Sequence, residues 1–371
     1  MRASLRKTIF LLVALAVVGF LLYHFRSGMG GKFFSWERFS SAVRHARLSL
    51  LVISVAAIYF CYFLRAVRWV RFSRYLGSMN LRRVYEATLM GFAAIFLLGR
   101  AGEPVRPLLI ARRENLPVSS MFGIYVIERV FDILATVIFA SLSLVFLPAL
   151  LAEHGSGGGT FLSLLQKGGA VLLVALLAAV GFLFYLRATE GGVVKRALEG
   201  WKLRTGWRAR VAGLFGGFLE GLQAVRTMGD LGVAAGVSAV HWMLILLIYH
   251  WVPASFGGQL AALDLRAAVL VLACTMLGST IQVPGIGGGS QAACYLAFHQ
   301  LLGVDSEPAL AAALMLWLVT FTSCSLVGIP LLIHEGMSFG ELRRIAGKER
   351  AAEEAGGHAA IEKDSTRGAA N

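Results

Sequence analysis

Residues 97–107 read Leu-Leu-Gly-Arg-Ala-Gly-Glu-Pro-Val-Arg-Pro, and residues 128–132 read Glu-Arg-Val-Phe-Asp. These ionisable side chains stand between segments that otherwise have the composition of lipid-soluble helices. A charged side chain at bilayer depth is costly unless it faces a cavity or a partner. The stretch from Leu97 to Asp132 therefore decides the arrangement of the chain, because its charges require an internal site.

The overall composition is that of a membrane protein. Of 371 residues, 57% are hydrophobic and 15% are charged, and the mean hydropathy is +0.71. These values exclude an ordinary soluble domain. Lys and Arg number 35 against 21 Asp and Glu, which indicates basic cytoplasmic loops and anionic lipid headgroups rather than nucleic acid as partners. The four cysteines lie in apolar stretches without metal-ligand spacing, so neither a metal nor a cofactor is expected.

Several stretches are long and apolar enough to cross a bilayer, which takes about 17–25 residues. They are Thr8–Tyr23, Leu48–Leu64, Phe131–Ala152, Phe161–Leu186, Leu231–Val252 and Pro308–His334. Two more, Val84–Leu98 and Arg266–Val283, stop at glycine or proline and are followed by the short apolar runs Val118–Ile127 and Ala292–Gly303. We predict an all-α polytopic membrane protein with about eight transmembrane helices, including broken or re-entrant hairpins.

Lys and Arg also predict the orientation of the chain. Basic residues crowd positions 65–83, 187–210 and 343–350, which we expect to be cytoplasmic together with both termini, in the inner cell membrane. The two broken pairs then enter the membrane from opposite faces. The order of segments in residues 8–152 recurs in residues 161–334 with the opposite orientation, which is typical of an inverted-topology repeat.

We therefore expect a single membrane domain over residues 1–335. It would consist of a first half (8–152), a connecting span with an amphipathic helix (153–230) and a second half (231–335). Residues 336–371 lack apolar periodicity, and we expect them to form a disordered cytoplasmic tail.

The first break supplies charge. Gly99 lets the backbone leave the helix, and non-helical backbone at this depth must be buried in protein or line water. Arg100 and Arg106 could then face a phosphate, for which a guanidinium group is suited. Glu103 could neutralise one of them or carry a proton. The alternative is an internal network of ion pairs that fixes the hairpin.

Helical spacing relates the charges that follow. Glu128 and Asp132 are four residues apart and Arg129 and Asp132 are three apart, so each pair shares a helix face. We predict a bridge between Arg129 and Asp132, which leaves Glu128 to reach Arg100 or Arg106.

The second break is uncharged. Residues 283–291 read Val-Pro-Gly-Ile-Gly-Gly-Gly-Ser-Gln. Backbone N–H groups there could form an anion-binding nest, with Gln282, Ser290 and Gln291 as side-chain partners. The alternative is a tight turn that lets helices approach closely.

Together, the two breaks resemble a known family, the lysylphosphatidylglycerol synthase transmembrane region, a flippase-like group of integral membrane proteins. The resemblance covers about residues 8–335. It rests on Gly99-Arg100-Ala101-Gly102-Glu103-x-x-Arg106, on Glu128-Arg129-x-x-Asp132 and on Pro284-Gly285-Ile286-Gly287-Gly288. Many members have Pro-Gly where this chain has Leu98-Gly99, and a glycine and an acidic residue where it has Ile286 and Gln291.

The resemblance implies that the chain moves a lipid between leaflets, either an aminoacylated phospholipid or one linked to polyprenyl phosphate. The implied lipid-binding or translocation residues are Arg100, Glu103, Arg106, Glu128, Arg129, Asp132, Pro284, Gly285, Gly287, Gly288 and Gln291. The alternative is a non-transporting membrane subunit that scaffolds a lipid-modifying enzyme or a glycosyltransferase. An enzymatic activity of the chain itself has little support, because no catalytic constellation emerges.

Overall fold

The computed structural model describes residues 36–74, 76–153, 174, 228–279, 282–283 and 287–336. The predicted span Thr8–Tyr23, nearly all of Phe161–Leu186, the amphipathic helix of the connecting segment and the C-terminal tail lie outside the described residues. Five helical stretches within the described residues are long and apolar enough to cross a membrane. The prediction of an all-α polytopic membrane protein is confirmed.

The first half contains one short helix, two long helices and a hairpin between them. Its elements are α2 (Trp36–Arg44), α3 (Leu48–Ser73), α4 (Leu81–Leu98), the 3₁₀ turn η1 (Gly99–Gly102), α5 (Val105–Glu114) and α6 (Val118–Glu153).

The second half begins with a long helix and again contains a hairpin. Its elements are α10 (Met228–Ala254), α11 (Gly258–Ala261), α12 (Leu265–Gly278), β1 (Gln282–Val283), β2 (Gly287–Gly288), α13 (Gly289–Leu296), the π-helical turn η2 (Ala297–Leu301), α14 (Ser306–Trp317), a second π-helical turn η3 (Leu318–Thr322) and α15 (Ser323–His334). The two-residue strands pair antiparallel and close the second break.

The first hairpin differs from its prediction. Its arms are α4 and α5, whereas Val118–Ile127, predicted as the returning arm, is the start of α6. Asn115 ends α5 in the left-handed conformation, with φ of 52°, and no proline interrupts the chain from Val118 to Pro148. The 36 residues of α6 extend about 54 Å at 1.5 Å per residue. This exceeds the hydrocarbon thickness of about 30 Å. Helix α6 therefore contains both the predicted short run and the predicted span, and it is longer than one crossing requires.

Glycines let the arms of both hairpins approach closely. A Cβ atom on Gly102 would lie 2.3 Å from the backbone oxygen of Ala94, and one on Gly278 would lie 2.4 Å from the backbone oxygen of Gly289. Gly99 (φ 64°, ψ −147°) and Gly288 (φ 104°, ψ −87°) have backbone angles that side chains with a Cβ rarely adopt. Each break thus depends on glycines that another residue could not replace without strain.

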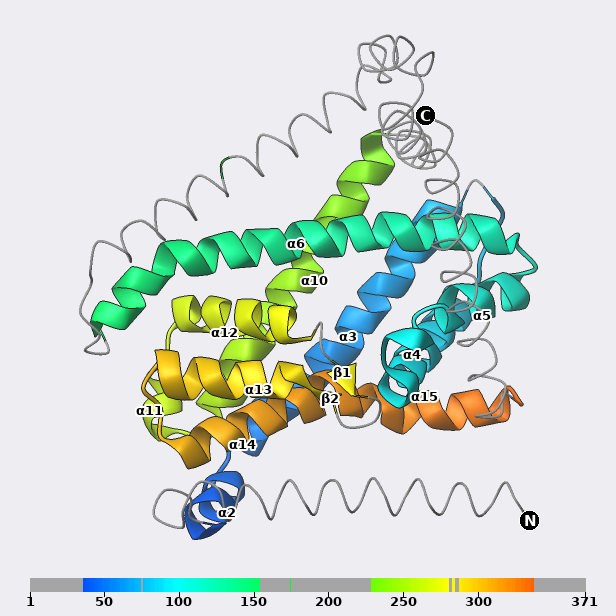
Figure 1. The fold of residues 1–371 in the computed structure, drawn as a ribbon. Coiled ribbons are helices and arrows are strands. Elements are labelled where there is room, and N and C mark those ends of the chain that lie inside the picture. Colours follow the sequence, from blue (N-terminus) through cyan, green and yellow to red (C-terminus); the bar gives the residue numbers. More distant parts are fainter. Residues whose placement is uncertain are drawn as a thin grey trace, which may run out of the picture.

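The two halves make equivalent contacts. Helix α4 packs on α3, α5 and α15, and α12 packs correspondingly on α10, α13 and α6. The contact of α5 with α6 matches that of α13 with α14, while α3 and α10 pack on each other at the centre. Figure 1 shows the α12–α13 hairpin on the left, the α4–α5 hairpin on the right and the short strands between them. Strand β1 also contacts η1, so the two breaks meet.

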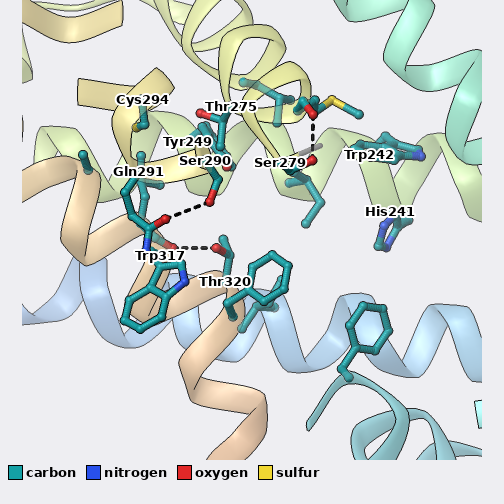
Figure 2. Close-up of a pocket in the computed structure, with 18 of the residues that line it drawn as sticks. His241, Trp242, Tyr249, Thr275, Ser279, Ser290, Gln291, Cys294, Trp317 and Thr320 are labelled. Atoms are coloured by element: carbon teal, nitrogen blue, oxygen red, sulfur yellow. Dashed lines mark hydrogen bonds between the residues drawn. The ribbon is translucent and has the colours of Figure 1, made fainter. Parts of the chain in front are cut away.

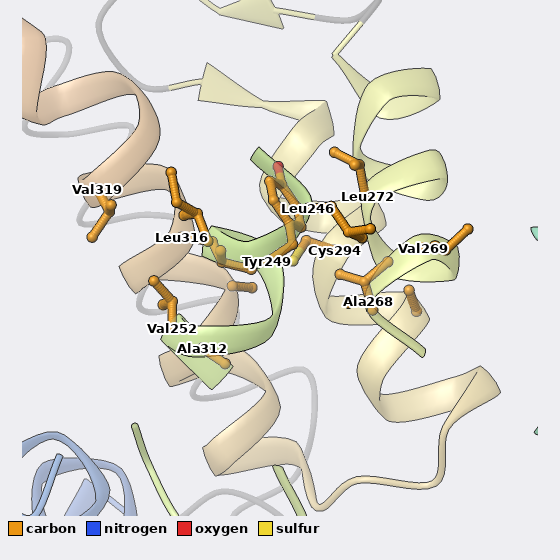
Figure 3. Packing of buried hydrophobic residues seen from close by; sticks show 14 of the residues in the cluster. Leu246, Tyr249, Val252, Ala268, Val269, Leu272, Cys294, Ala312, Leu316 and Val319 are labelled. Carbon is orange, nitrogen blue, oxygen red and sulfur yellow. The ribbon is translucent and has the colours of Figure 1, made fainter. Parts of the chain in front are cut away.

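The main apolar core lies between α10 and the second hairpin. Figure 3 shows side chains of α10, α12, α13 and α14 packed together, among them Leu246, Tyr249, Val252, Leu272, Cys294, Ala312 and Leu316. The cysteines are free, and Cys61, Cys294 and Cys324 are buried. This core holds the second hairpin against the central helix pair.

Candidate functional site

A fully buried carboxylate, that of Glu128 on α6, lies at the centre of the charged residues. It is 0% exposed and accepts hydrogen bonds from Arg65 Nη1 at 2.8 Å, Arg68 Nη2 at 2.7 Å and Trp69 Nε1 at 2.9 Å. Arg106 Nη2 donates to Glu128 Oε2, the oxygen that also accepts from Trp69, and forms an ion pair with it. A buried carboxylate is tolerated only when it is paired and hydrogen-bonded, and four donor residues meet that requirement here.

Local sequence places these donors. Arg65, Arg68 and Trp69 are spaced i, i+3 and i+4, so they share one face of α3. Arg106 lies in the first turn of α5. Its Cβ atom is 2.5 Å from where a Cβ of Gly91 on α4 would lie, so glycine at position 91 makes room for it.

The network extends from Glu128 to the neighbouring helices. Asp132 Oδ2 accepts from Arg65 Nη1 at 3.1 Å and pairs with Arg129 Nη2 at 3.4 Å. Arg68 Nη1 donates to Ser238 Oγ of α10 at 2.6 Å. We call Arg65, Arg68, Arg106, Glu128, Arg129 and Asp132 the charged cluster. It joins α3, α5 and α6 and reaches the second half of the chain through α10.

Aromatic rings cover the guanidinium groups of the cluster. Arg106 Cζ lies 4.9 Å from the ring centroid of Trp69, and Arg129 Cζ lies 5.0 Å from that of Tyr125. Arg65 Cζ lies 5.4 Å from the ring centroid of Phe92. Such cation–π contacts are worth about 0.5–2 kcal/mol each, so they help to hold buried arginines away from water.

The structure forms the predicted bridge between Arg129 and Asp132, and Glu128 reaches Arg106 as predicted. Of the two roles considered for Arg106, contact with a phosphate or membership of an internal network of ion pairs, the structure therefore favours the internal network. Glu103 accepts a hydrogen bond from the Tyr125 hydroxyl instead of neutralising either arginine. Arg100 is exposed, and its side chain has no hydrogen bond or ion pair with another described residue.

Sequence reasoning ended the second span at Leu64 and placed Arg65 and Arg68 in the segment that follows it, and this end of the span is wrong. Helix α3 continues to Ser73, and both side chains are buried, at 8% and 2% exposed. The run of arginines after Leu64 looked like a loop flanking a span. Apolar residues between those arginines, with Trp69 at helical spacing from Arg65, are the signal that the helix continues.

An elongated cavity adjoins the charged cluster through Arg65. Its volume is about 170 Å³, or about 820 Å³ when the open space at its mouth is counted, and its walls come from α3, α4, α10, α12, α13, α14 and η3. The walls are mostly apolar, with a few polar side chains. Such a composition is typical of sites for small ligands.

The second hairpin contributes Ser290 and Gln291 to the cavity wall. Gln291 Oε1 accepts from the Gly288 N–H at 2.6 Å and from the Ser290 hydroxyl at 3.0 Å, as Figure 2 shows for the second contact. The Gly288 N–H is thus used inside the turn, which favours the tight turn over an anion nest at this N–H. Gly287 lies in β2, while Pro284 and Gly285 lie outside the described residues, as does the side chain of Gln282.

Comparisons with known proteins show the family of this chain. A family model described as the lysylphosphatidylglycerol synthase TM region matches residues 9–328. Glycosyltransferase AglD of Haloferax volcanii is 32% identical over 197 residues, which cover 47% of this chain but only 31% of that relative. A UPF0104 membrane protein of Methanothermobacter thermautotrophicus is 23% identical over 315 residues, 81% of this chain and 89% of the relative. The chain therefore belongs to the family of the lysylphosphatidylglycerol synthase TM region.

Proposed function

We propose that this protein is a lipid translocase, which moves an anionic lipid between the two leaflets of the cell membrane. The observation that carries the proposal is the place of Arg65. Its guanidinium group belongs to the buried charged cluster and also lines the apolar cavity. A cation at the end of an apolar cavity suits a ligand with a negatively charged head and a hydrocarbon chain.

Glu128 has a positioning role in this proposal. Its two oxygens are already occupied by Arg65, Arg68, Trp69 and Arg106. It therefore fixes the arginines and does not contact the lipid. Arg65 presents the charge to the cavity, and the exposed Arg100 offers a second contact for a headgroup near the first break.

Two opposed hairpins provide a route for movement. Their breaks meet. The contacts of α4 correspond to those of α12, the contacts of α5 to those of α13, and the contacts of α6 to those of the stretch from α14 to α15. Equivalent halves with opposite orientation would give two related states, each open to one side of the membrane. The inverted repeat, the cytoplasmic termini and the limits of the two halves are part of this proposal.

Leaflet exchange in reconstituted vesicles tests the proposal. The purified full-length chain is placed in vesicles with fluorescent phosphatidylglycerol, and exchange is followed by chemical quenching of the outer leaflet. Met276 lines the cavity, whereas Leu277, the next residue of α12, is 60% exposed on the outside. We expect Met276→Trp to lose most of the exchange and Leu277→Trp to retain it. Exchange equal to that of protein-free vesicles would refute the proposal.

A second candidate function follows from the similarity to glycosyltransferase AglD. The chain could act as a membrane subunit that holds a lipid-modifying or glycosyl-transferring enzyme without transporting anything. This alternative predicts no exchange by the purified chain and co-purification of such an enzyme from its native membrane. Exchange that depends on residue 276 would contradict it.

A further inference from the structure

Two polar atoms in the cavity wall are buried without a partner. His241 is 4% exposed, and its Nδ1 has no hydrogen bond to another described residue. The indole N–H of the next residue, Trp242, is also buried and unpaired within the described part of the chain. Both residues line the cavity together with Arg65. Figure 2 shows them side by side on α10, at the opposite end from Gln291 and Trp317. An unpaired buried polar atom is unfavourable, so this end of the cavity is built to receive a polar group.

The charges around this end are unbalanced. Within the charged cluster, three buried arginines and the partly exposed Arg129 face two carboxylates, which leaves an excess of two positive charges. Counting Glu103, which Tyr125 links to the cluster, still leaves an excess of one. Buried cations need compensating negative charge. An anionic ligand would supply it.

The described wall of the cavity offers no carboxylate with which a cation could form an ion pair. Among its described wall residues, the ionisable side chains besides tyrosine and cysteine are Arg65 and His241, and none is Asp or Glu. The carboxylates that contact Arg65, those of Glu128 and Asp132, already pair with arginines. Gln291 also lines the wall, and its amide is neutral, so it adds no negative charge.

We infer that the cavity selects a lipid whose head carries a phosphate and no ammonium group, with the phosphate between Arg65 and His241. This inference rests on the proposed function and narrows its substrate. An aminoacylated headgroup such as a lysyl ester would bring a cation into a region that already has excess positive charge. A phosphate has acceptor oxygens for the guanidinium, for the Trp242 indole N–H and for His241 in the tautomer that carries its proton on Nδ1.

Binding to single-chain probes tests this selection. The full-length chain in uncharged maltoside micelles is titrated with dodecyl phosphate, with dodecylphosphocholine and with inorganic phosphate. The first two share a dodecyl chain and a phosphate, but the second is the choline ester of the first, so it gains an ammonium group and its phosphate keeps one negative charge at most. The third lacks the chain. We expect dodecyl phosphate to bind at least about 10-fold more tightly than dodecylphosphocholine, with inorganic phosphate weaker still.

Variants connect the binding to the residues named. His241→Phe should weaken dodecyl phosphate about 10-fold, because it removes a hydrogen bond to a charged group. His241→Asn keeps a polar atom at the position of Nδ1 and should retain most of the affinity. His250→Phe is the matched control, since His250 lies on the same helix and does not line this cavity. Gln291→Glu adds a carboxylate of nearly the same shape and should reduce the preference for dodecyl phosphate.

Three results would overturn the inference. They are equal or tighter binding of dodecylphosphocholine, an affinity that His241→Phe leaves unchanged, and inorganic phosphate binding as tightly as dodecyl phosphate. The last would identify a site for a free anion. Each can occur while wild-type vesicles still exchange lipid, so failure of the inference is distinguishable from failure of the proposed function.

Discussion

Replacing Glu128 by Gln removes the charge at the centre of the buried network while keeping the side chain's shape. Its carboxylate accepts from four residues, and its exposed fraction is zero. With a neutral amide, Arg106 would have no ion pair with another described residue, Arg65 and Arg68 would be left with Asp132, and an amide N–H would face a donor. Breaking a buried ion pair from one side costs about 3–5 kcal/mol. We expect Glu128→Gln to lower the free energy of unfolding by about that amount.

Unfolding can be followed through the buried free thiols of Cys61, Cys294 and Cys324, which react with a fluorogenic maleimide only when the helices separate. Arg82→Gln is the control, because Arg82 is 87% exposed in its pair with Glu86, and exposed pairs contribute little. The double variant Glu128→Gln with Arg106→Met should cost less than the sum of the single variants, because it removes both partners of one pair. Additive costs, or a Glu128→Gln variant as stable as wild type, would refute this reading of the network.

Other predictions concern the hairpins and the helix contacts. Gly102→Ala should destabilise the first hairpin, since the new Cβ would lie 2.3 Å from a backbone oxygen, whereas Gly123→Ala, with no atom within 4 Å, should not; the thiol-reactivity melt compares them. Ser238→Ala removes the acceptor of Arg68 and should cost about 1–3 kcal/mol in the same melt. Although burial raises the pKa of Asp264, the Ala267 N–H and Arg266 lower it below its usual value. The stability it gives to α12 as N-cap should therefore persist above about pH 4 and be lost as the pH falls further, and Asp264→Ala should abolish that pH dependence.

Local sequence predicts the breaks because their cause is local. Gly99 and Gly288 adopt backbone angles that favour glycine, and an interruption of an apolar stretch is visible without knowledge of the fold. Helical spacing likewise predicts the pair of Arg129 and Asp132, because both residues lie on one helix. The same spacing left Glu128 to reach Arg100 or Arg106, and Arg106 is one of its three arginine partners.

Other features depend on tertiary packing and could not be read from the sequence. Arg65 and Arg68 follow an apolar span, as loop residues do, and only the approach of α6 makes their burial favourable. The continuity of α6 was hidden because its charged part interrupts the apolar pattern, although those charges face protein. The cavity combines residues from helices far apart in the chain, such as Arg65 and Gln291, so no local pattern indicates it.

The most direct test of a lipid site beside Arg65 is a cryo-electron microscopy map of the full-length chain in nanodiscs that contain anionic lipid. We predict density for a lipid in the cavity, with its phosphate within hydrogen-bonding distance of the Arg65 guanidinium and of His241, and with its chain along the apolar wall near Leu272 and Leu316. Lipid density confined to the outer surface of the helices, with an empty cavity beside Arg65, would contradict both the site and the translocation pathway built on it.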